Sequence, residues 1–545
     1  MGTIKSLVVV VAVFTGSGAV SRAQQQQTPS STPLGGRQGQ QTSVYGTLYG
    51  RAINGISKVP YTLDQEYLEW PLPPDDKQYG AIEGKRLKGY VADLVGIAEH
   101  YRDQGNQFWG RITGTSSDTE TQDWLIGKFK AAGLSDVHSQ PLDTPPQWIP
   151  TSWRVAATGE GKSLQLDSAQ PMMSSPATPD QGLNLDAVWV GLGTEADFSG
   201  RDVRGKAVFI YSATYNHINT SALLNGSVKR AASKGAAAIF IIFALPGNIK
   251  AQFYNLGVQV PTFAIGLDDG NSVRAMIEQA EPSSPPKVSL VLHTAMVPGK
   301  TGNVWGTLPG MTDEKIYIIS MREGWFDGAT NNAAGIATLV GLADYFGKIP
   351  KEKRRRTMIF LATTGHHGNG VDGKPHVTLS GVWITEHHAE LFKNTALILN
   401  CEYTATTQTE LYMGGQVQST DAQSEGLYWF VRGAPQLTQA AYNAYREFGV
   451  PIFSQPSPSP VGEMYGFDQF APSLQLINMG TYSHTNYDTL AMVPWTGLEA
   501  VTRAYAKVID DVNRYSIPQL AWPWGEKAAP QGSSSGGTAT GGNRP

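Results

Sequence analysis

The sequence predicts an α/β protein built on a largely parallel sheet that is covered by helices. From Asn303 onward, short apolar segments of strand length alternate with helical segments, a rhythm typical of parallel sheets. The 545 residues, 41% of them hydrophobic, are enough for more than one core. A β-rich stretch over residues 182–293 interrupts the chain before this alternation and predicts a separate insert.

Two helices are predicted ahead of the insert. Residues 86–101 carry apolar side chains at helical spacing. A second helix is expected to start at a capping box over residues 119–122 and to stop at Gly133.

The insert, residues 182–293, is predicted to consist mainly of short strands separated by Gly and Asp. One helix is expected within it, near residues 228–234. Its strands are expected at residues 188–190, 208–211, 239–242 and 263–265.

The alternating part of the chain predicts where a site should lie. Helices are expected at residues 333–346 and, to close the domain, over residues 498–512. Strands are expected at residues 316–320, 358–362, 396–400 and 474–478. Because ligands of open parallel sheets bind just beyond the carboxyl ends of the strands, a site is expected near residues 321, 364, 401 and 479.

The N-terminus predicts export. Lys5 precedes an apolar run too short to cross a bilayer, and Ser21 and Ala23 stand at the −3 and −1 positions of a signal-peptidase site. Residues 1–23 are therefore interpreted as a signal peptide cleaved after Ala23, and the protein as secreted or periplasmic. Segments 24–44 and 527–545 have low-complexity compositions that predict disorder. The α/β domain then comprises residues 45–181 and 294–526.

Composition excludes several classes of function. With 42 basic and 46 acidic residues the net charge is −4, and loss of Lys5 and Arg22 with the signal peptide leaves 40 basic residues, for −6. This balance argues against nucleic acid as a partner. The single cysteine excludes an internal disulfide framework and a Cys-rich zinc module. No second segment is long and apolar enough to span a membrane, so an integral membrane protein is not expected after cleavage.

Five side chains suited to metal binding or proton transfer stand at the predicted strand ends. These residues are Glu323, His366, His367, Glu402 and His484. Three of the ten histidines therefore gather at one edge of the predicted sheet, which makes this edge the candidate site.

The chain resembles the zinc exopeptidases, a family that includes bacterial leucyl aminopeptidases, glutamate carboxypeptidase II and the transferrin receptor. The resemblance spans residues 86–512 and rests on Asn-Val-Trp-Gly-Thr-Leu-Pro-Gly at 303–310 and Tyr-Ser-His-Thr at 482–485, followed by Tyr-Asp-Thr at 487–489. The insert resembles the family's protease-associated domain in its segments 200–208, 234–238 and 261–263. The resemblance implies a three-layer α/β/α domain with a mostly parallel central sheet and a β-rich protease-associated insert.

The resemblance also implies two zinc ions, held by a His, a bridging Asp, a Glu, an Asp and a final His, with a further Glu as base. Aligned through Trp325, the first His falls on Met321, its supporting Asp on Glu323 and the bridging Asp on Asn331. The thioether of Met321 suits copper(I) better than zinc. The neutral amide of Asn331 is a weak donor at a position where the family has a carboxylate that bridges two cations. The later Asp position retains a carboxylate, at Glu402. The first metal's ligand set is therefore largely dismantled.

The second ligand set is less altered. The base falls on His366, the adjacent ligand on His367, and the final ligand is retained as His484. Imidazoles are good zinc ligands, so His367 and His484, with His366 or Glu402, are a set for one zinc ion, while a two-zinc centre is not expected. Such an ion would lower the pKa of a bound water, and His366 would then be the substitute base.

Three interpretations follow. In the first, the protein keeps the exopeptidase fold, has lost peptidase activity and acts as a binding or structural module for a peptide or protein partner. In the second, it is a single-metal hydrolase of amides or peptides using His367 and His484. In the third, it is an active aminopeptidase with unusual ligands, in which Glu323 or Asp327 supplies the missing carboxylates.

Overall fold

A computed structural model describes residues 70–216, 219–254, 257–371, 379–412, 416–419, 424–452 and 454–521. The predicted signal peptide at 1–23, the low-complexity segment 24–44 and the tail 527–545 lie outside these residues. Within the described part of the chain, none of the helices has the length and apolarity that crossing a bilayer requires.

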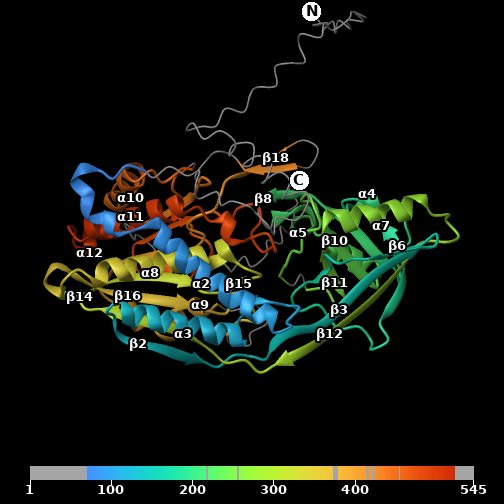
Figure 1. Ribbon diagram of the computed structural model, residues 1–545, viewed down its shortest axis with the longest axis horizontal. Coiled ribbons are helices and arrows are strands. Elements are labelled where there is room, and N and C mark those ends of the chain that lie inside the picture. The colour runs from blue at the N-terminus through green and yellow to red at the C-terminus, as the bar shows by residue number, and fades with distance from the viewer. Residues whose placement is uncertain are drawn as a thin grey trace, which may run out of the picture. The chain divides into compact units, whose positions relative to one another are not determined.

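The first sheet has seven strands with a parallel centre (Figure 1). The central strands β16, β14, β17 and β21 are parallel to one another, and antiparallel strands lie at both edges. In sheet order the strands are β2 (Ser135–Leu142), β13 (Thr301–Leu308), β16 (Arg356–Thr363), β14 (Thr312–Met321), β17 (Thr395–Cys401), β21 (Ser473–Ile477) and β20 (Tyr428–Arg432). The predicted parallel sheet is confirmed, with its central strands close to the expected positions.

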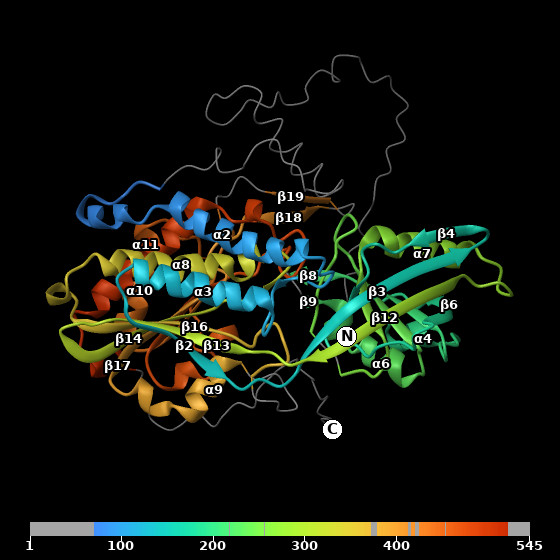
Figure 2. The ribbon, with the colours of Figure 1, turned by 60° about the horizontal axis from the view of Figure 1, so that its bottom comes forward.

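Helices cover both faces of this sheet, and Figure 2 shows α8 and α9 on opposite sides of its strands. Side chains along β14 alternate between the two faces: Ile316 and Ile318 join the larger hydrophobic core, while Tyr317 and Ile319 join a second core beneath α9. The helices are α2 (Gly84–Asp103), α3 (Ser116–Ala131), α8 (Ala334–Gly347), α9 (Ser380–His387), α10 (Pro435–Glu447), α11 (Trp495–Val512) and α12 (Ile517–Leu520). The α/β fold expected from the sequence is therefore observed.

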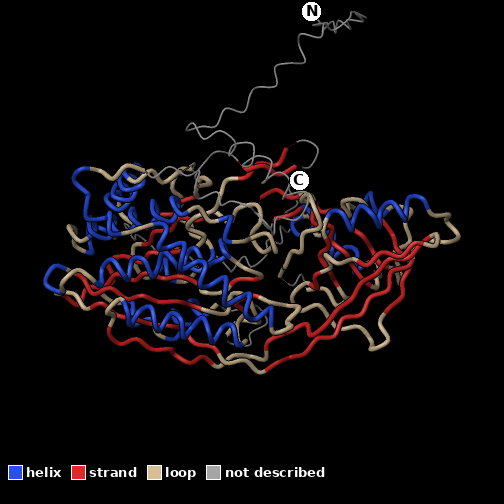
Figure 3. Tube along the Cα trace, in the orientation of Figure 1, coloured by secondary structure: helices blue, strands red, loops and turns tan. Residues whose placement is uncertain are grey.

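A second sheet of eight strands contains the strands of the insert, and Figure 3 shows strands dominating this part of the chain. In sheet order they are β4 (Lys162–Gln165), β3 (Gln147–Gly159), β12 (Lys287–Val297), β6 (Leu183–Trp189), β7 (Ala207–Ser212), β10 (Ala238–Phe243), β11 (Thr262–Ile265) and β5 (Gln170–Pro171). Strands β3, β4 and β5 precede residue 182, so this sheet draws on residues before the predicted insert. The domain boundaries themselves stay a prediction.

Two local expectations need correction. Helix α3 begins at Ser116, ahead of the capping box expected at 119–122, because Asp118 holds its first turn: it accepts a local hydrogen bond from Gly114 N and forms a tertiary ion pair with Arg322. The insert contains more than the one expected helix. Besides α6 (Ser227–Ser233) it has the short helices α4 (Glu195–Phe198) and α5 (Ser221–Leu224) and the longer α7 (Leu267–Gln279).

Short elements complete the described chain. Strand pairs are β1 (Gly110–Arg111) with β15 (Gly324–Trp325), β8 (Thr214–Asn216) with β9 (Asn219–Thr220), and β18 (Thr409–Tyr412) with β19 (Gln416–Ser419). Short 3-10 or π-helical segments are η3 (Pro74–Ala81), η4 (Ala329–Ala333), η5 (Lys351–Lys353), η6 (Ala389–Phe392), η7 (Gly462–Met464), η8 (Phe467–Gln469) and η9 (Leu490–Met492).

Candidate functional site

The three predicted histidines lie together beyond the carboxyl ends of the parallel strands. The ring centroids of His366 and His367 are 5.2 Å apart, and those of His367 and His484 are 5.3 Å apart. The side chain of His367 is fully buried and His484 is 1% exposed, while the side chain of His366 keeps 16% of its surface exposed. The structure therefore brings the three imidazoles into one cluster, with His366 at its outer side.

Two aromatic side chains belong to this cluster and were not predicted as site residues. Trp325 stands edge-to-face with His367 and His484, at centroid distances of 4.3 and 4.8 Å. Tyr254, which comes from the insert, lies 5.0 Å from Trp325. Trp325 lies in the segment that follows the first predicted strand, so its position in the sequence could have identified it. No spacing in the sequence connects Tyr254 with the strand ends.

Glu323 is held by five hydrogen bonds. Its Oε1 accepts from the hydroxyls of Thr113 (2.6 Å) and Thr364 and from Gly365 N (2.8 Å). Its Oε2 accepts from the backbone N–H groups of His366 (2.6 Å) and His367 (2.9 Å). The carboxylate is fully buried, so these donors replace water around its charge. Glu323 thereby fixes the backbone that carries both histidines.

Met321 and Asn331, which the resemblance places at two metal-ligand positions, contact other side chains of the protein. The Asn331 amide lies 3.1 Å from Nε2 of His367, and its backbone N–H donates to Asp488 at 3.0 Å. Met321 packs in a buried apolar cluster with Tyr403 and Ile477. Both Met321 and Asn331 are completely buried.

Glu402 lies with a second acid, Glu463, which the sequence did not identify. Oε2 of Glu402 accepts hydrogen bonds from Asn400 (2.9 Å) and from the backbone N–H of Glu463 (3.0 Å). Glu463 Oε2 lies 3.7 Å from His366 Nδ1, an ion-pair distance that is too long for a hydrogen bond. Both oxygens of Glu463 are buried without a hydrogen-bond partner in the part of the chain that the structure describes. A carboxylate therefore reaches His366 from a distant loop.

The charges around the histidines give them different protonation. Burial alone would lower the pKa of His366, but Glu463, Glu402 and Glu323 outweigh it and raise this pKa. Burial lowers the pKa of His367 far below its usual range, and His366 and His484 add to this effect. His367 is therefore neutral near pH 7, whereas His366 is the histidine poised to carry a proton.

Two buried arginines hold the loop beneath the cluster. Arg322 donates to Oδ1 of Asp118 through Nε (2.9 Å) and Nη2 (2.7 Å), and both side chains are fully buried. Arg111 donates to five backbone carbonyls, those of Leu94, Arg322, Asp327, Gly328 and Asn331. These contacts tie α2 and α3 to the segment between β14 and α8.

The described residues contain no group of three or more His, Cys, Asp or Glu side chains placed to hold a metal ion. Glu402 and Glu323 each accept several hydrogen bonds from the protein.

Asp327, on the loop before η4, makes folding stability depend on pH. Burial raises the pKa of Asp327 to about 7, with Glu99 and Asp488 adding to the rise. The folded chain thus holds this proton more tightly than the unfolded chain. Its stabilising contribution is complete below about pH 4 and is lost as the pH rises through about 7.

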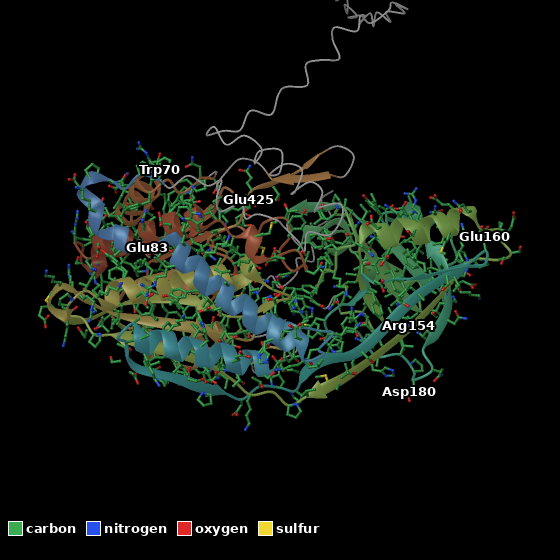
Figure 4. All side chains as sticks on the ribbon, in the orientation of Figure 1. Trp70, Glu83, Arg154, Glu160, Asp180 and Glu425 are labelled. Atoms are coloured by element: carbon green, nitrogen blue, oxygen red, sulfur yellow. The ribbon has the colours of Figure 1, made fainter. Side chains whose placement is uncertain are left out.

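We expect Asp327→Asn to gain stability relative to the wild type as the pH rises, because asparagine releases no proton. Urea denaturation of both proteins at about pH 5 and about pH 8 measures the difference. Asp180→Asn is the control, since Asp180 is exposed (Figure 4). The expectation is contradicted if the free energies of unfolding of Asp327→Asn and the wild type differ by the same amount at both pH values.

The seven-stranded sheet with a parallel centre and helices on both faces defines an α/β fold. Residues 303–509 match the sequence profile of peptidase family M28, so this part of the chain is an M28 domain. The family expected from the sequence is therefore confirmed. No curated protein matches the sequence.

Solved structures of bacterial peptidases share the fold. A zinc aminopeptidase from Bacillus subtilis matches with 16% identity and a TM-score of 0.54, covering 83% of this chain and 97% of its own. An aminopeptidase from Aneurinibacillus sp. strain AM-1 matches with 18% identity and a TM-score of 0.50, covering 80% and 95%. A peptidase M28 precursor from Shewanella amazonensis SB2B matches with 20% identity and a TM-score of 0.58, covering 82% and 99%. At these identities the likeness concerns the fold.

Proposed function

We propose that this protein keeps the M28 fold, does not hydrolyse peptides and acts as an exported binding or structural module, with the insert as its protease-associated domain. One observation carries the proposal. At the position where the family places a carboxylate bridging two zinc ions, Asn331 carries an amide hydrogen-bonded to Nε2 of His367. The protein's own side chain thereby engages the nitrogen that would ligate a metal.

Three further observations support the proposal. Met321 packs among apolar side chains, which removes the first histidine ligand. The oxygens of Glu323 accept five hydrogen bonds, so this acid is a poor replacement for a missing ligand, as the third interpretation would require. The base position holds His366, and without a bridging carboxylate and a carboxylate base both halves of the two-zinc mechanism are lost.

A second candidate function is a single-metal amide hydrolase. It is favoured by the 5.3 Å between the ring centroids of His367 and His484, because two imidazoles on one zinc ion have centroids about 5 Å apart. Its ligands would be His367, His484 and either His366 or Glu402. It requires the Asn331 amide to release Nε2 of His367 before a metal binds.

An activity assay separates the two. The purified protein, supplied with excess zinc, is tested on aminoacyl p-nitroanilides and on dipeptides beside the Bacillus subtilis zinc aminopeptidase as a positive control. We expect turnover no higher than that of His367→Ala. Turnover that disappears in His367→Ala overturns the proposal in favour of the second candidate.

A further inference from the structure

A segment of the insert is hydrogen-bonded to the chain at His484. This segment, Lys250–Tyr254, is called the strap. Ala251 forms an antiparallel bridge with Thr485, and Gln252 N donates to the carbonyl of His484 at 2.9 Å. Asn486 N donates to the carbonyl of Lys250 at 3.1 Å, and Lys250 N donates to Oδ1 of Asn486 at 2.9 Å. The insert therefore reaches the histidine cluster through a short two-stranded contact.

The strap is also fixed to the insert and to the strands beside it. The buried Gln252 side chain donates to the carbonyl of Pro171 at 3.1 Å and accepts from Nε2 of Gln170 at 2.8 Å. The carbonyl of Phe253 accepts from Met173 N at 3.0 Å. Bonds on both sides hold the strap in one position, which fixes the side chain that follows.

That side chain is Tyr254, and its ring lies near all three imidazoles. Its centroid is 5.8 Å from His484, 6.2 Å from His366 and 6.3 Å from His367. Its hydroxyl is buried and has no hydrogen-bond partner among the described residues. Burial, with the negative charges of nearby glutamates, raises the pKa of Tyr254 well above its usual range, so the phenol stays neutral.

We propose that the strap is a plug built into the chain, in which the ring of Tyr254 closes the two inner histidines, His367 and His484, to solutes. His367 and His484, each 1% exposed or less, have ring centroids 6.3 and 5.8 Å from that of Tyr254, and in this proposal the insert determines what reaches these two imidazoles. The inference rests on the proposed function, because a working metallopeptidase has to admit both metal and substrate to its site. The hydroxyl has no part in closure, and the volume of the ring is what matters.

Diethyl pyrocarbonate, which acylates neutral imidazoles, tests the plug in metal-free buffer containing a chelator. Modification of each histidine is followed over time by peptide mass spectrometry in the wild type and in Tyr254→Ala. We expect His367 and His484 to react at least about tenfold faster in the variant, because acylation of a buried group is limited by its exposure. The exposed His387 is the internal reference and should react equally in both proteins.

Matched variants separate plugging from a general loss of structure. Tyr254→Phe keeps the ring and should protect the histidines as the wild type does. Tyr465→Ala removes a tyrosine that is 46% exposed and should change nothing. Phenol added to Tyr254→Ala should restore protection of His367 and His484, since the cavity left by the missing ring can bind a molecule of the same size. If Tyr254→Ala does not fold, Tyr254→Leu takes its place and is expected to increase reactivity in the same direction.

The proposal is overturned if His367 and His484 react as fast as His387 in the wild type. It is also overturned if they stay protected in folded Tyr254→Ala or Tyr254→Leu. Peptide hydrolysis by the wild type overturns the proposed function by a separate measurement. The reactivity ratios in metal-free buffer report on the strap alone.

Discussion

Replacing Glu323 with glutamine is expected to lower the free energy of unfolding by about 4 kcal/mol. The glutamine keeps one acceptor oxygen but turns an NH2 group toward donors that now face no acceptor. An NH2 group at the Oε2 position faces the backbone N–H groups of His366 and His367, and one at the Oε1 position faces that of Gly365, so either orientation leaves a backbone donor without its acceptor. Losing a charge-assisted bond and leaving buried donors unpaired are both costly.

Urea denaturation of Glu323→Gln and of the wild type at one pH checks this. Glu352→Gln is the matched control, because Glu352 is exposed and its replacement should change stability by less than about 0.5 kcal/mol. If Glu323→Gln and Glu352→Gln had the same urea midpoint, the Glu323 carboxylate would be dispensable for stability, against our interpretation.

Arg322→Met is expected to lower the free energy of unfolding by about 4 kcal/mol, because it leaves the carboxylate of Asp118 buried without its cation. The guanidinium also donates to Thr301 Oγ1 at 2.7 Å and to the carbonyl of Thr363 at 3.2 Å. Removing both charges, in Asp118→Leu with Arg322→Met, should cost less than the sum of the single changes by about 2 kcal/mol.

An exposed ion pair of equal length provides the control for this double-mutant cycle. Arg274 and Glu278 lie 2.7 Å apart, as do Arg322 and Asp118, but their side chains are 45% and 52% exposed. Arg274→Met should therefore cost less than about 1 kcal/mol. Equal losses for Arg274→Met and Arg322→Met would show that burial does not set the strength of the inner pair.

The sequence was informative where structure follows a local pattern. The apolar segment 316–320 is a buried run of strand length, and it lies within β14. The strand ends followed from the same patterns, and parallel pairing places Met321 beside Thr363 and Ile319 beside Asn400. Glu323, His366, His367 and Glu402 each follow the end of a predicted strand, and the sequence therefore identified them as candidates.

Residues that reach the site from loops were beyond such reasoning. Tyr254 precedes His484 by more than two hundred positions, and only tertiary hydrogen bonds of the strap bring them together. Glu463 lies in η7, where Gly462 has φ +61° and a Cβ atom would lie 2.5 Å from Glu402 Oε2. Gly462 beside the isolated Glu463 was the only local feature we find in the sequence that could have indicated this acid. It does not reveal which strand end Glu463 approaches.

The partners of individual side chains were equally inaccessible. Residue types at the ligand positions indicated a degenerate centre, but the hydrogen bond of Asn331 to His367 and the five donors around Glu323 depend on atomic positions. Spacing predicts which elements meet, whereas hydrogen-bond geometry decides how each group is satisfied.

In our proposal this site does not hold the zinc pair of a peptidase. The purified protein is dialysed against excess zinc, free metal is removed and zinc per chain is measured by atomic absorption, with the Bacillus subtilis zinc aminopeptidase in parallel. We predict zinc well below one ion per chain, unchanged in His367→Ala. Two zinc ions per chain, both lost on replacing His367 and His484, would contradict the account.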